Sequence, residues 1–587
     1  MAAPETVVAI DFGTTRSAWA YKVSGQANDK VLVRIPGGTL NSPSATTKTE
    51  TVALIGGSGR GDLIAFGPEA LESYANNYHP KDQALFRWFK IALCEPTGKT
   101  AVNSVMTEST AGHNVPLIGV MKASLVYFKD DVVAFLSSTA GRTIRAEDVS
   151  WVLTVPAIYD DFSKQFMRQA AHEAGMIDRV NSTKLRLCLE PEAACLAAIT
   201  KDNPLTCEAE GKKMMIIDCG GGTVDITAHE IVSVEPLKLA EVVAPDGGMF
   251  GSTRVDDAFK EWLETFLGER FKRVKTSGTL VSIMLSWESK KAAFQGQKST
   301  QPVRFNLSEL AEFDMGTRDM EDLRTRYNQG QPSSHRVGGR LFNVTLPTTL
   351  VTSFFTPTLE KIGKCLRGIK HESGLRDLHR VYIVGGFSRC PLLRERVRAE
   401  LGQPGCSVVE VHEPDIAIVR GAVMYFDRST VFNSRKARLT YGTDVSVPFV
   451  HGNAEHLRRR SAGRTSDIDG KGLYANGIFS PHIRIGDDIP VGGVCSRQKY
   501  TPLNKNGTIM TEIVYASTER NPSFVDSSSC YEVGRVSFML DMTKETTEER
   551  AYRVEYTFGG PELTVKILHH TEEKEITDAV MTVSRAI

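Results

Sequence analysis

An apolar run that ends in an aspartate and a glycine-containing turn occurs twice in this chain. Residues 7–17 read VVAIDFGTTRS, and residues 215–226 read MIIDCGGGTVDI. Short apolar runs of this kind are typical of buried strands. The glycines let backbone N–H groups approach a phosphate, and the aspartates can hold a hydrated Mg²⁺ beside it. The second copy alone could be a strand and a hairpin turn, but the repeat predicts two related halves that bind one nucleotide.

The length of 587 residues predicts several domains, because a single hydrophobic core does not grow this large. Lys and Arg together number 70, as do Asp and Glu, so no bulk basic charge favours nucleic acid. We expect no signal peptide, and no uncharged apolar run approaches the roughly 20 residues of a membrane span. Ten cysteines are scattered without a CxxC pair. They predict reduced thiols in a cytoplasmic protein rather than disulfides or a metal site.

A further acid lies where a predicted strand meets a predicted helix. Residues 185–189 form an apolar strand, and residues 190–198, EPEAACLAA, follow as a helix whose first turn Pro191 favours. We expect a functional role for Glu190 at this junction. The alternative is that Glu190 only compensates the partial positive charge of the helix start. For Glu192 we favour that alternative.

Residues 84–93, ALFRWFKIAL, predict an amphipathic helix, because aromatic and aliphatic residues recur at helical spacing. Lys90 is the single lysine of this segment. A lone lysine on such a helix is usually solvated, but it could also be held toward a γ-phosphate. The local sequence leaves both interpretations open.

Two later segments contain candidates for the base end of a nucleotide site. Residues 380–391, RVYIVGGFSRCP, predict a strand, the pair Gly385-Gly386 and then a helix, so that a flat ring can pack against bare backbone. A preceding helix contains Glu288 and Lys291 one turn apart. The alternative for these two residues is an exposed ion pair.

The composition changes near residue 430. Apolar strands and helical segments alternate up to that point, which indicates an α/β fold. From residue 483 onward, alternating apolar runs are broken by turns. These runs predict an antiparallel β domain of about 150 residues.

Four motifs, in this order, resemble the actin-like ATPase superfamily shared by actin, hexokinase and the heat-shock 70 chaperones. They are DFGTTRSAW from Asp11, LEPEAACLAA from Leu189, IDCGGGTVDI from Ile217 and VYIVGGFSRCP from Val381. The strand that runs into Pro156-Ala157 and the EPEAA helix are most similar to the heat-shock 70 nucleotide-binding domain. The divergent 12-like branch resembles the chain best, because it contains a phenylalanine–lysine pair, here Phe89-Lys90, and a TYG segment, here residues 440–442. The resemblance covers residues 5–430 and is thin beyond them.

This resemblance implies a fold and a domain organisation. The fold is α/β, an actin-like ATPase fold of two duplicated ribonuclease-H-like halves at about residues 1–200 and 201–430. A smaller, mainly β domain follows at residues 431–587. We expect it to be a shortened version of the family's substrate-binding domain, without a helical lid.

The resemblance also implies a role for each matching residue. Asp11 and Asp218 would hold the water shell of Mg²⁺. Lys90 would contact the γ-phosphate, and Glu190 and Asp225 would orient or deprotonate the attacking water. The residues around the phosphates would be Gly13, Thr14, Thr15, Gly220, Gly221, Gly222 and Thr223. Those around the adenosine would be Glu288, Lys291, Gly385, Gly386, Arg389 and Asp415.

The chain departs from the family pattern at several positions. Ala292 follows the adenosine lysine, where the family has an arginine, and Phe387 replaces a small hydroxyl residue beside the base. Gly251-Ser252-Thr253 stands in place of a Gly-Gly-Glu turn. Residues 428–445 contain no acidic, leucine-rich linker, and we expect no EEVD-like terminus.

These features lead to one main hypothesis and two alternatives. We expect a heat-shock 70-like protein that binds ATP or ADP with Mg²⁺, hydrolyses ATP slowly and couples hydrolysis to a protein or peptide partner of the β domain. The first alternative is a nucleotide-gated scaffold or adaptor with little hydrolysis, which the missing linker and lid favour. The second is a small-metabolite kinase, which would need an acceptor pocket and a base in the cleft. The EPEAA helix and the β domain argue against this kinase.

Overall fold

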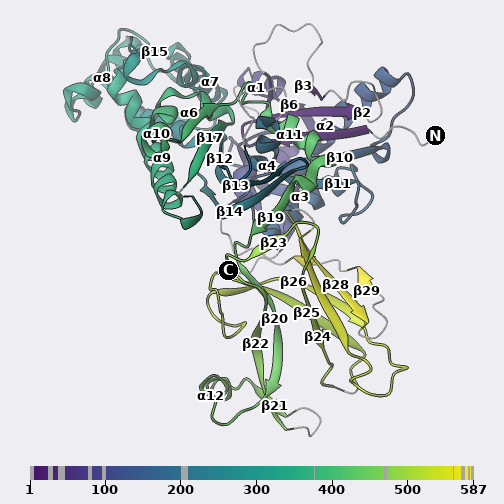
Figure 1. Cartoon of the computed structure of the whole chain (residues 1–587). Helices are drawn as coiled ribbons and strands as arrows, with labels where there is room; N and C mark the ends of the chain where they lie inside the picture. The colour runs from purple at the N-terminus through teal and green to yellow at the C-terminus, as the bar shows by residue number, and fades with distance from the viewer. Residues whose placement is uncertain are drawn as a thin grey trace.

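The computed structural model describes residues 6–23, 31–36, 47–76, 82–94, 101–199, 209–299, 301–375, 377–467, 472–504, 506–558, 561–569, 575–578 and 582–583. These residues form an α/β body and a group of β-strands that lies below the body in Figure 1.

The first sheet of the body has six strands. Its order is β11 (Leu185–Leu189), β10 (Val149–Val155), β1 (Thr6–Phe12), β2 (Arg16–Val23) and β3 (Leu32–Arg34), and β4 (Thr49–Glu50) also pairs with β2. β1 runs parallel to β10 and antiparallel to β2. The buried strand predicted before the turn at residues 13–15 is therefore confirmed.

The second sheet has seven strands and repeats this arrangement. Its order is β18 (Ser407–Glu410), β17 (Leu378–Val384), β12 (Lys213–Cys219), β13 (Val224–Val234), β14 (Leu237–Gly248), β19 (Phe432–Lys436) and β23 (Asp488–Pro490). β12 is antiparallel to β13 and parallel to β17, as β1 is to β2 and to β10. The repeated order supports the predicted duplication.

Two helices pack between the sheets, α4 (Glu190–Ala198) and α11 (Ala417–Arg428). Their apolar side chains share one buried core with residues of both sheets, among them Ala9, Ile216 and Tyr382. A Cβ added at Gly421 of α11 would lie 1.7 Å from the carbonyl oxygen of Ala193 in α4. Glycine is therefore required where the two helices touch. This contact fixes the distance between the two halves behind the cleft.

The other helices surround the sheets, and three small sheets complete the body (Figure 1). Among the described residues, no helix is both long and apolar enough to cross a membrane. These helices are α1 (Pro68–Ala75), α2 (Leu117–Ala140), α3 (Asp161–Glu173), α5 (Thr253–Leu267), α6 (Phe271–Val274), α7 (Gly278–Ala293), α8 (Thr317–Gln329), α9 (Thr348–Lys370) and α10 (Pro391–Leu401). The helix α12 (Ala454–Ser461) lies instead among the C-terminal strands (Figure 1). The small sheets contain β5 (Val52–Gly56), β6 (Leu63–Phe66) and β7 (Gln83–Arg87); β8 (Met106–Glu108) and β9 (Asn114–Pro116); and β15 (Val303–Asn306) and β16 (Asn343–Leu346).

The helix predicted over residues 84–93 is wrong. The segment begins as β7, which pairs with β5, and continues as a short 3-10 helix, Phe89–Leu93. Trp88 separates the two elements with a φ of 57°. Ala84, Leu85 and Phe86 are all buried, and such a short apolar stretch fits a strand buried on both faces as well as it fits a helix. Ten residues are too few for the spacing to distinguish the two.

The C-terminal strands form two sheets, which agrees with the predicted β character. One has the order β21 (Thr465–Asp467), β22 (Leu473–Ile483), β20 (Thr440–Pro448), β25 (Ile509–Ser517), β26 (Cys530–Met539) and β30 (Thr582–Val583). The other contains β24 (Val494–Tyr500), β27 (Tyr552–Phe558), β28 (Leu563–His569) and β29 (Glu575–Asp578). Side chains of both sheets share one core, which includes Val514, Phe538 and Val554.

The chain passes from the body to these sheets through a strand of the body. β19 pairs with β14, and β23 returns from the C-terminal part to pair with β19. Arg435 of β19 donates hydrogen bonds of 2.6 and 2.9 Å to the carboxylate of Glu192 in α4, and both side chains are buried. Glu192 therefore anchors this junction, and the helix-start role that the sequence favoured is incomplete.

The Arg435–Glu192 pair gives a stability prediction. Arg435→Met should lower the free energy of unfolding of the body by about 3–5 kcal/mol, because it leaves a buried carboxylate without its partner. Urea unfolding followed by tryptophan fluorescence measures this loss. The double variant Arg435→Met/Glu192→Gln should be more stable than the sum of the single effects implies.

The matched control is Arg535→Met, which breaks a largely exposed pair with Glu532 on β26. It should cost less than about 1 kcal/mol. Additive effects of Arg435→Met and Glu192→Gln would contradict the coupling.

Candidate functional site

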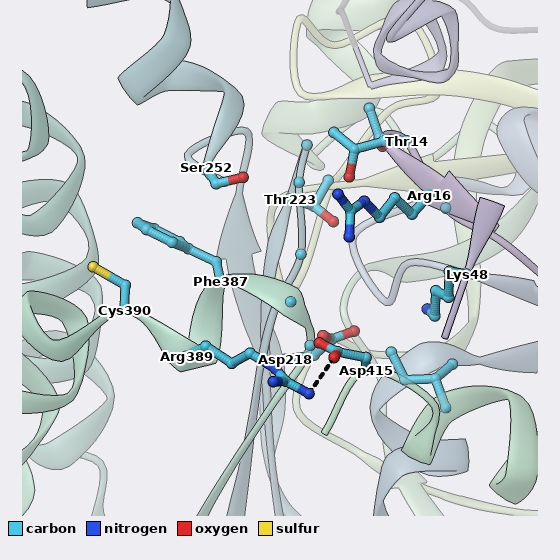
Figure 2. Close-up of a pocket in the computed structure, with 18 of the residues that line it drawn as sticks. Thr14, Arg16, Lys48, Asp218, Thr223, Ser252, Phe387, Arg389, Cys390 and Asp415 are labelled. Atoms are coloured by element: carbon cyan, nitrogen blue, oxygen red, sulfur yellow. Dashed lines mark ion pairs between the residues drawn. The ribbon is translucent and has the colours of Figure 1, made fainter. Parts of the chain in front are cut away.

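A cavity of about 320 Å³ opens between the two halves. All predicted site residues except Asp225 line it: Asp11, Gly13, Thr14, Thr15, Lys90, Glu190, Asp218, Gly220, Gly221, Gly222, Thr223, Glu288, Lys291, Gly385, Gly386, Arg389 and Asp415. In Figure 2, Thr14, Arg16 and Lys48 lie on one side, and Phe387 and Cys390 lie on the other. The motifs that are far apart in the sequence therefore meet in one place.

The two glycine-containing turns touch each other. A Cβ added at Gly221 would lie 2.3 Å from Oγ1 and 2.8 Å from Cβ of Thr15. At Gly222 it would lie 2.5 Å from Oγ1 of Thr14. Only residues without a side chain allow the second turn to approach the first so closely. The halves thus present backbone N–H groups and threonine hydroxyls to the same space.

Four carboxyl groups come together behind these turns, those of Asp11, Glu190, Asp218 and Asp225. Asp218 and Asp225 are direct cross-strand partners in β12 and β13, an arrangement in which like charges destabilise a sheet. Burial, followed by the charges of Glu190 and Asp225, raises the pKa of Asp218 well above its usual value. Burial also raises the pKa of Glu190 to about 7, although the charge of Lys90 opposes this shift. The four carboxyl groups are therefore stabilised when they bind protons or when further cations lie beside them.

Asp225 lies behind the cavity wall. It is fully buried, and its Oδ1 accepts a hydrogen bond of 2.9 Å from the N–H of Ile158, the second residue after Pro156. Burial raises its pKa, and that backbone bond opposes the shift. The predicted contact of Asp225 with the attacking water stays a prediction.

Lys90, which is buried, and Lys48, which is largely buried, compensate part of the acidic charge. The Lys90 ammonium donates to the carbonyl of Phe12 at 2.6 Å and to Oε1 of Glu190 at 3.1 Å. Its exposed fraction is 1%, so the solvated-lysine interpretation of Lys90 is wrong. Lys48, which immediately precedes β4, contacts the carboxylate of Asp11. The sequence analysis missed Lys48, which has no motif around it.

The acids fit a metal held through water better than one ligated directly. In the described part of the chain, no group of three or more His, Cys, Asp or Glu side chains is spaced to ligate an ion. Oδ1 of Asp218, however, is buried and has no hydrogen-bond partner there. A hydrated Mg²⁺ would donate water O–H groups to such an oxygen. This agrees with the water-mediated role that the family resemblance implies for Asp218.

The predicted adenosine residues line the same cavity, and Gly385 lies beside Asp218. Gly385 has a φ of 84°, and a Cβ there would lie 2.6 Å from Oδ1 of Asp218, so glycine is required at this turn. Arg389 and Asp415 form an ion pair of 2.5 Å across the mouth (Figure 2). They bring a planar cation close to bare backbone, which suits a flat ring.

Glu288 and Lys291 have separate partners, so the predicted alternative of an ion pair between them is wrong. Arg87 of β7 pairs with Glu288 at 2.5 Å and connects the two halves. Lys291 contacts both carboxylate oxygens of Asp256 at 2.7 Å, and the Trp287 N–H also donates to this carboxylate at 2.8 Å. Both predicted adenosine residues are thus already engaged in ion pairs.

Several lining residues were not found from the sequence. Asp256 lies within the first turn of a helix whose glycine-rich start was the only signal. Of the others, Arg16, Ser252 and Cys390 lie within the quoted glycine-containing segments but were not expected to line the site. The others are Arg16, Thr47, Lys48, Trp88, Ser252, Phe355, Cys390 and Ile418.

Comparison with known proteins agrees with this geometry. A family model described as "Hsp70 protein" matches residues 128–430, more than half of the 587 residues. The chain belongs to the Hsp70 family. It is therefore an Hsp70-like ATP-binding protein, and the actin-like ATPase fold follows from the family.

Within the Hsp70 family the chain is a divergent member of the 12-like branch, as its relatives indicate. It is 26% identical to human heat shock 70 kDa protein 12A over 641 residues, which cover 97% of this chain and 90% of that protein. It is 25% identical to human heat shock 70 kDa protein 12B, with 98% and 90% covered. Chaperone protein DnaK of Stenotrophomonas maltophilia (strain R551-3) is 24% identical, with 71% of this chain and 59% of that protein covered.

The contact between the two turns gives a second stability prediction. Gly221→Ala should destabilise the body by about 1–3 kcal/mol, because its methyl group forces the turn away from Thr15. The midpoint of thermal unfolding measures the effect. Gly119→Ala on α2 is the control, since a Cβ there has nothing within 4 Å. Equal midpoints for the two variants would contradict the close approach.

Proposed function

We propose that this protein hydrolyses ATP slowly with Mg²⁺ and couples the nucleotide state to a protein or peptide partner of its β-sheets. The observation that carries this proposal is the contact between the two turns that follow Asp11 and Asp218, together with Oδ1 of Asp218, which has no hydrogen-bond partner in the described part of the chain. Phosphoryl transfer depends mainly on positioning and on charge neutralisation, and this cavity is built for both.

Each side chain of the phosphate end has a role in this proposal. Asp218, together with Asp11, holds the water shell of Mg²⁺, which neutralises phosphate charge when it is bound. Lys90 is buried and directed by Phe12 and Glu190, so it meets the γ-phosphate as a fixed cation. Glu190 accepts a proton from the attacking water, and Asp225 orients the loop behind it. The turn residues bind the β- and γ-phosphates: Gly13, Thr14, Thr15, Gly220, Gly221, Gly222 and Thr223.

The adenosine end binds the ribose and base in this proposal. Glu288 and Lys291 hold the ribose and ring, and Gly385, Gly386 and Arg389 form the base pocket beside Asp415. The pairs with Arg87, Asp256 and Asp415 keep these side chains extended toward the cavity.

A chain of contacts supports coupling to the β-sheets. Asp225 accepts from the N–H of Ile158. The neighbouring carbonyl, that of Ala157, accepts a hydrogen bond from Arg438. Arg438 lies between β19 and β20, where the chain leaves the body. A shift of Asp225 would therefore move Arg438, which lies where the chain enters the C-terminal β-sheets.

A nucleotide-gated scaffold with little hydrolysis is the second candidate function. Ala292 lines the base end where the family resemblance leads us to expect an arginine. Lys291 is fully engaged by Asp256. Both features favour a protein that responds to nucleotide binding more than to turnover.

We also propose that the protein works in the cytoplasm. The nine described cysteines are free thiols, several of them buried. Reduced, buried cysteines suit a reducing compartment.

Phosphate release from ATP tests the enzyme proposal. The wild-type protein should release phosphate with Mg²⁺ and stop when EDTA is added. Asp218→Asn should lower the rate by at least about 100-fold, because it removes a charge at the metal. Asp427→Asn, at a half-exposed partner of Lys22, is the matched control and should keep the full rate. Tight ATP binding with equal background release from all three proteins would favour the scaffold.

The pH dependence of that rate tests the role of Glu190. Its pKa of about 7 means that the ionised, proton-accepting form increases as pH rises. Phosphate release at saturating ATP and Mg²⁺ should therefore rise between pH 6 and 8. Glu190→Gln should lower the rate about 100-fold and remove the rise. A rise that persists in Glu190→Gln would assign the titration to another group.

A further inference from the structure

Lys48 is held firmly beside the phosphate turn. It immediately precedes β4, which pairs with β2 on the other side of the turn. The N–H of Thr51 donates to the carbonyl of Thr15 at 2.8 Å, and the hydroxyls of Ser17 and Thr51 are 2.7 Å apart. The backbone around Lys48 is thus tied to the same hairpin that presents the threonines. The Lys48 side chain is only 12% exposed.

The ammonium of Lys48 lies among the buried carboxyl groups of the cavity. It contacts Oδ2 of Asp11, and it lines the cavity together with Asp218 and Glu190. Burial by itself would lower the pKa of Lys48, but the charge and hydrogen bond of Asp11 raise it, as do the charges of Asp218 and Glu190. The side chain therefore remains a cation at neutral pH.

Both carboxylate oxygens of Asp11 already have a partner. Oδ2 is taken by Lys48, and Oδ1 accepts a hydrogen bond of 3.0 Å from the hydroxyl of Thr154. Asp218 still has an oxygen without a partner in the described residues. Of the two acids expected to hold the water shell of Mg²⁺, one thus has an oxygen without a partner in the described residues, and the other already pairs with a cation.

We propose that Lys48 is a built-in cation of the phosphate site, which supplies from the protein part of the positive charge that Mg²⁺ brings with a nucleotide. Nucleotide binding then persists without Mg²⁺, and a free metal ion competes with Lys48 for Asp11. This inference rests on the proposed nucleotide site. A purely structural ion pair would affect folding but would leave the Mg²⁺ dependence of binding unchanged.

Two titrations test this inference on the full chain. The first measures ATP affinity by calorimetry with Mg²⁺ and again with EDTA. The second measures Mn²⁺ affinity by electron paramagnetic resonance without nucleotide. The proteins are the wild type, Lys48→Met, the charge-keeping Lys48→Arg and the control Lys298→Met, at an exposed lysine paired with Glu395. Circular dichroism checks that each variant is folded.

We expect the wild type and Lys298→Met to bind ATP in EDTA within about threefold of their affinity with Mg²⁺. Lys48→Met should lose about 10- to 100-fold in EDTA, the range for one charge-assisted contact, and recover with Mg²⁺. Lys48→Arg should behave nearly as the wild type. Mn²⁺ should bind Lys48→Met about 10-fold more tightly than the wild type, because Asp11 is released.

The outcomes separate this inference from the function it rests on. Equal loss of ATP affinity in EDTA for the wild type and Lys48→Met would overturn the inference. So would equal Mn²⁺ affinity for the two proteins. If no protein binds ATP under either condition, the proposed nucleotide function fails. The Mn²⁺ titration then still decides whether Lys48 competes with a metal. If Lys48→Met does not fold, the ATP affinities of the wild type and Lys48→Arg in EDTA decide. A loss well beyond threefold in both proteins would then overturn the inference.

Discussion

Negative charge buried in the cleft is the constraint on which the rest of the structure depends. Asp11, Glu190, Asp218 and Asp225 all lie within the body with at most 7% of their surface exposed. Two unit charges 4 Å apart repel by about 4 kcal/mol at the intermediate dielectric of a protein cleft. Lys48 and Lys90 compensate part of this charge by ion pairs with Asp11 and Glu190. The cleft therefore stays receptive to further cations or protons, as a phosphate-transfer site must.

The duplicated sheets explain why these acids meet. Asp11 and Asp218 occupy the same place, next to the last residue of β1 and of β12. Glu190 directly follows β11, which lies in the same sheet as β1. Side chains at the carboxyl ends of neighbouring parallel strands gather at one edge of a sheet. The backbone contact at Gly421 then holds the two edges face to face.

Residues within motifs could be predicted from the sequence, and residues without motifs could not. The turns at Asp11 and Asp218 and the junction at Glu190 carry glycines and prolines that constrain the backbone, so their geometry follows from local rules. Lys48 and Asp256 reach the cavity only through tertiary packing, and nothing beside them in the chain marks them. The helix predicted around Lys90 is wrong because a short, mostly apolar segment fits a buried strand as well as it fits a helix.

The position of β19 has a consequence for anyone who cuts or recombines this chain. The second sheet of the body is completed by β19 and then by β23, which comes from beyond β20 and β22. Truncation near residue 430 would leave the backbone N–H and C=O groups of β14 as an open edge, which is prone to pair with other chains. A fragment that ends after β20 would still lack β23. The body and the β-sheets are therefore interlocked, and no single junction yields two complete parts.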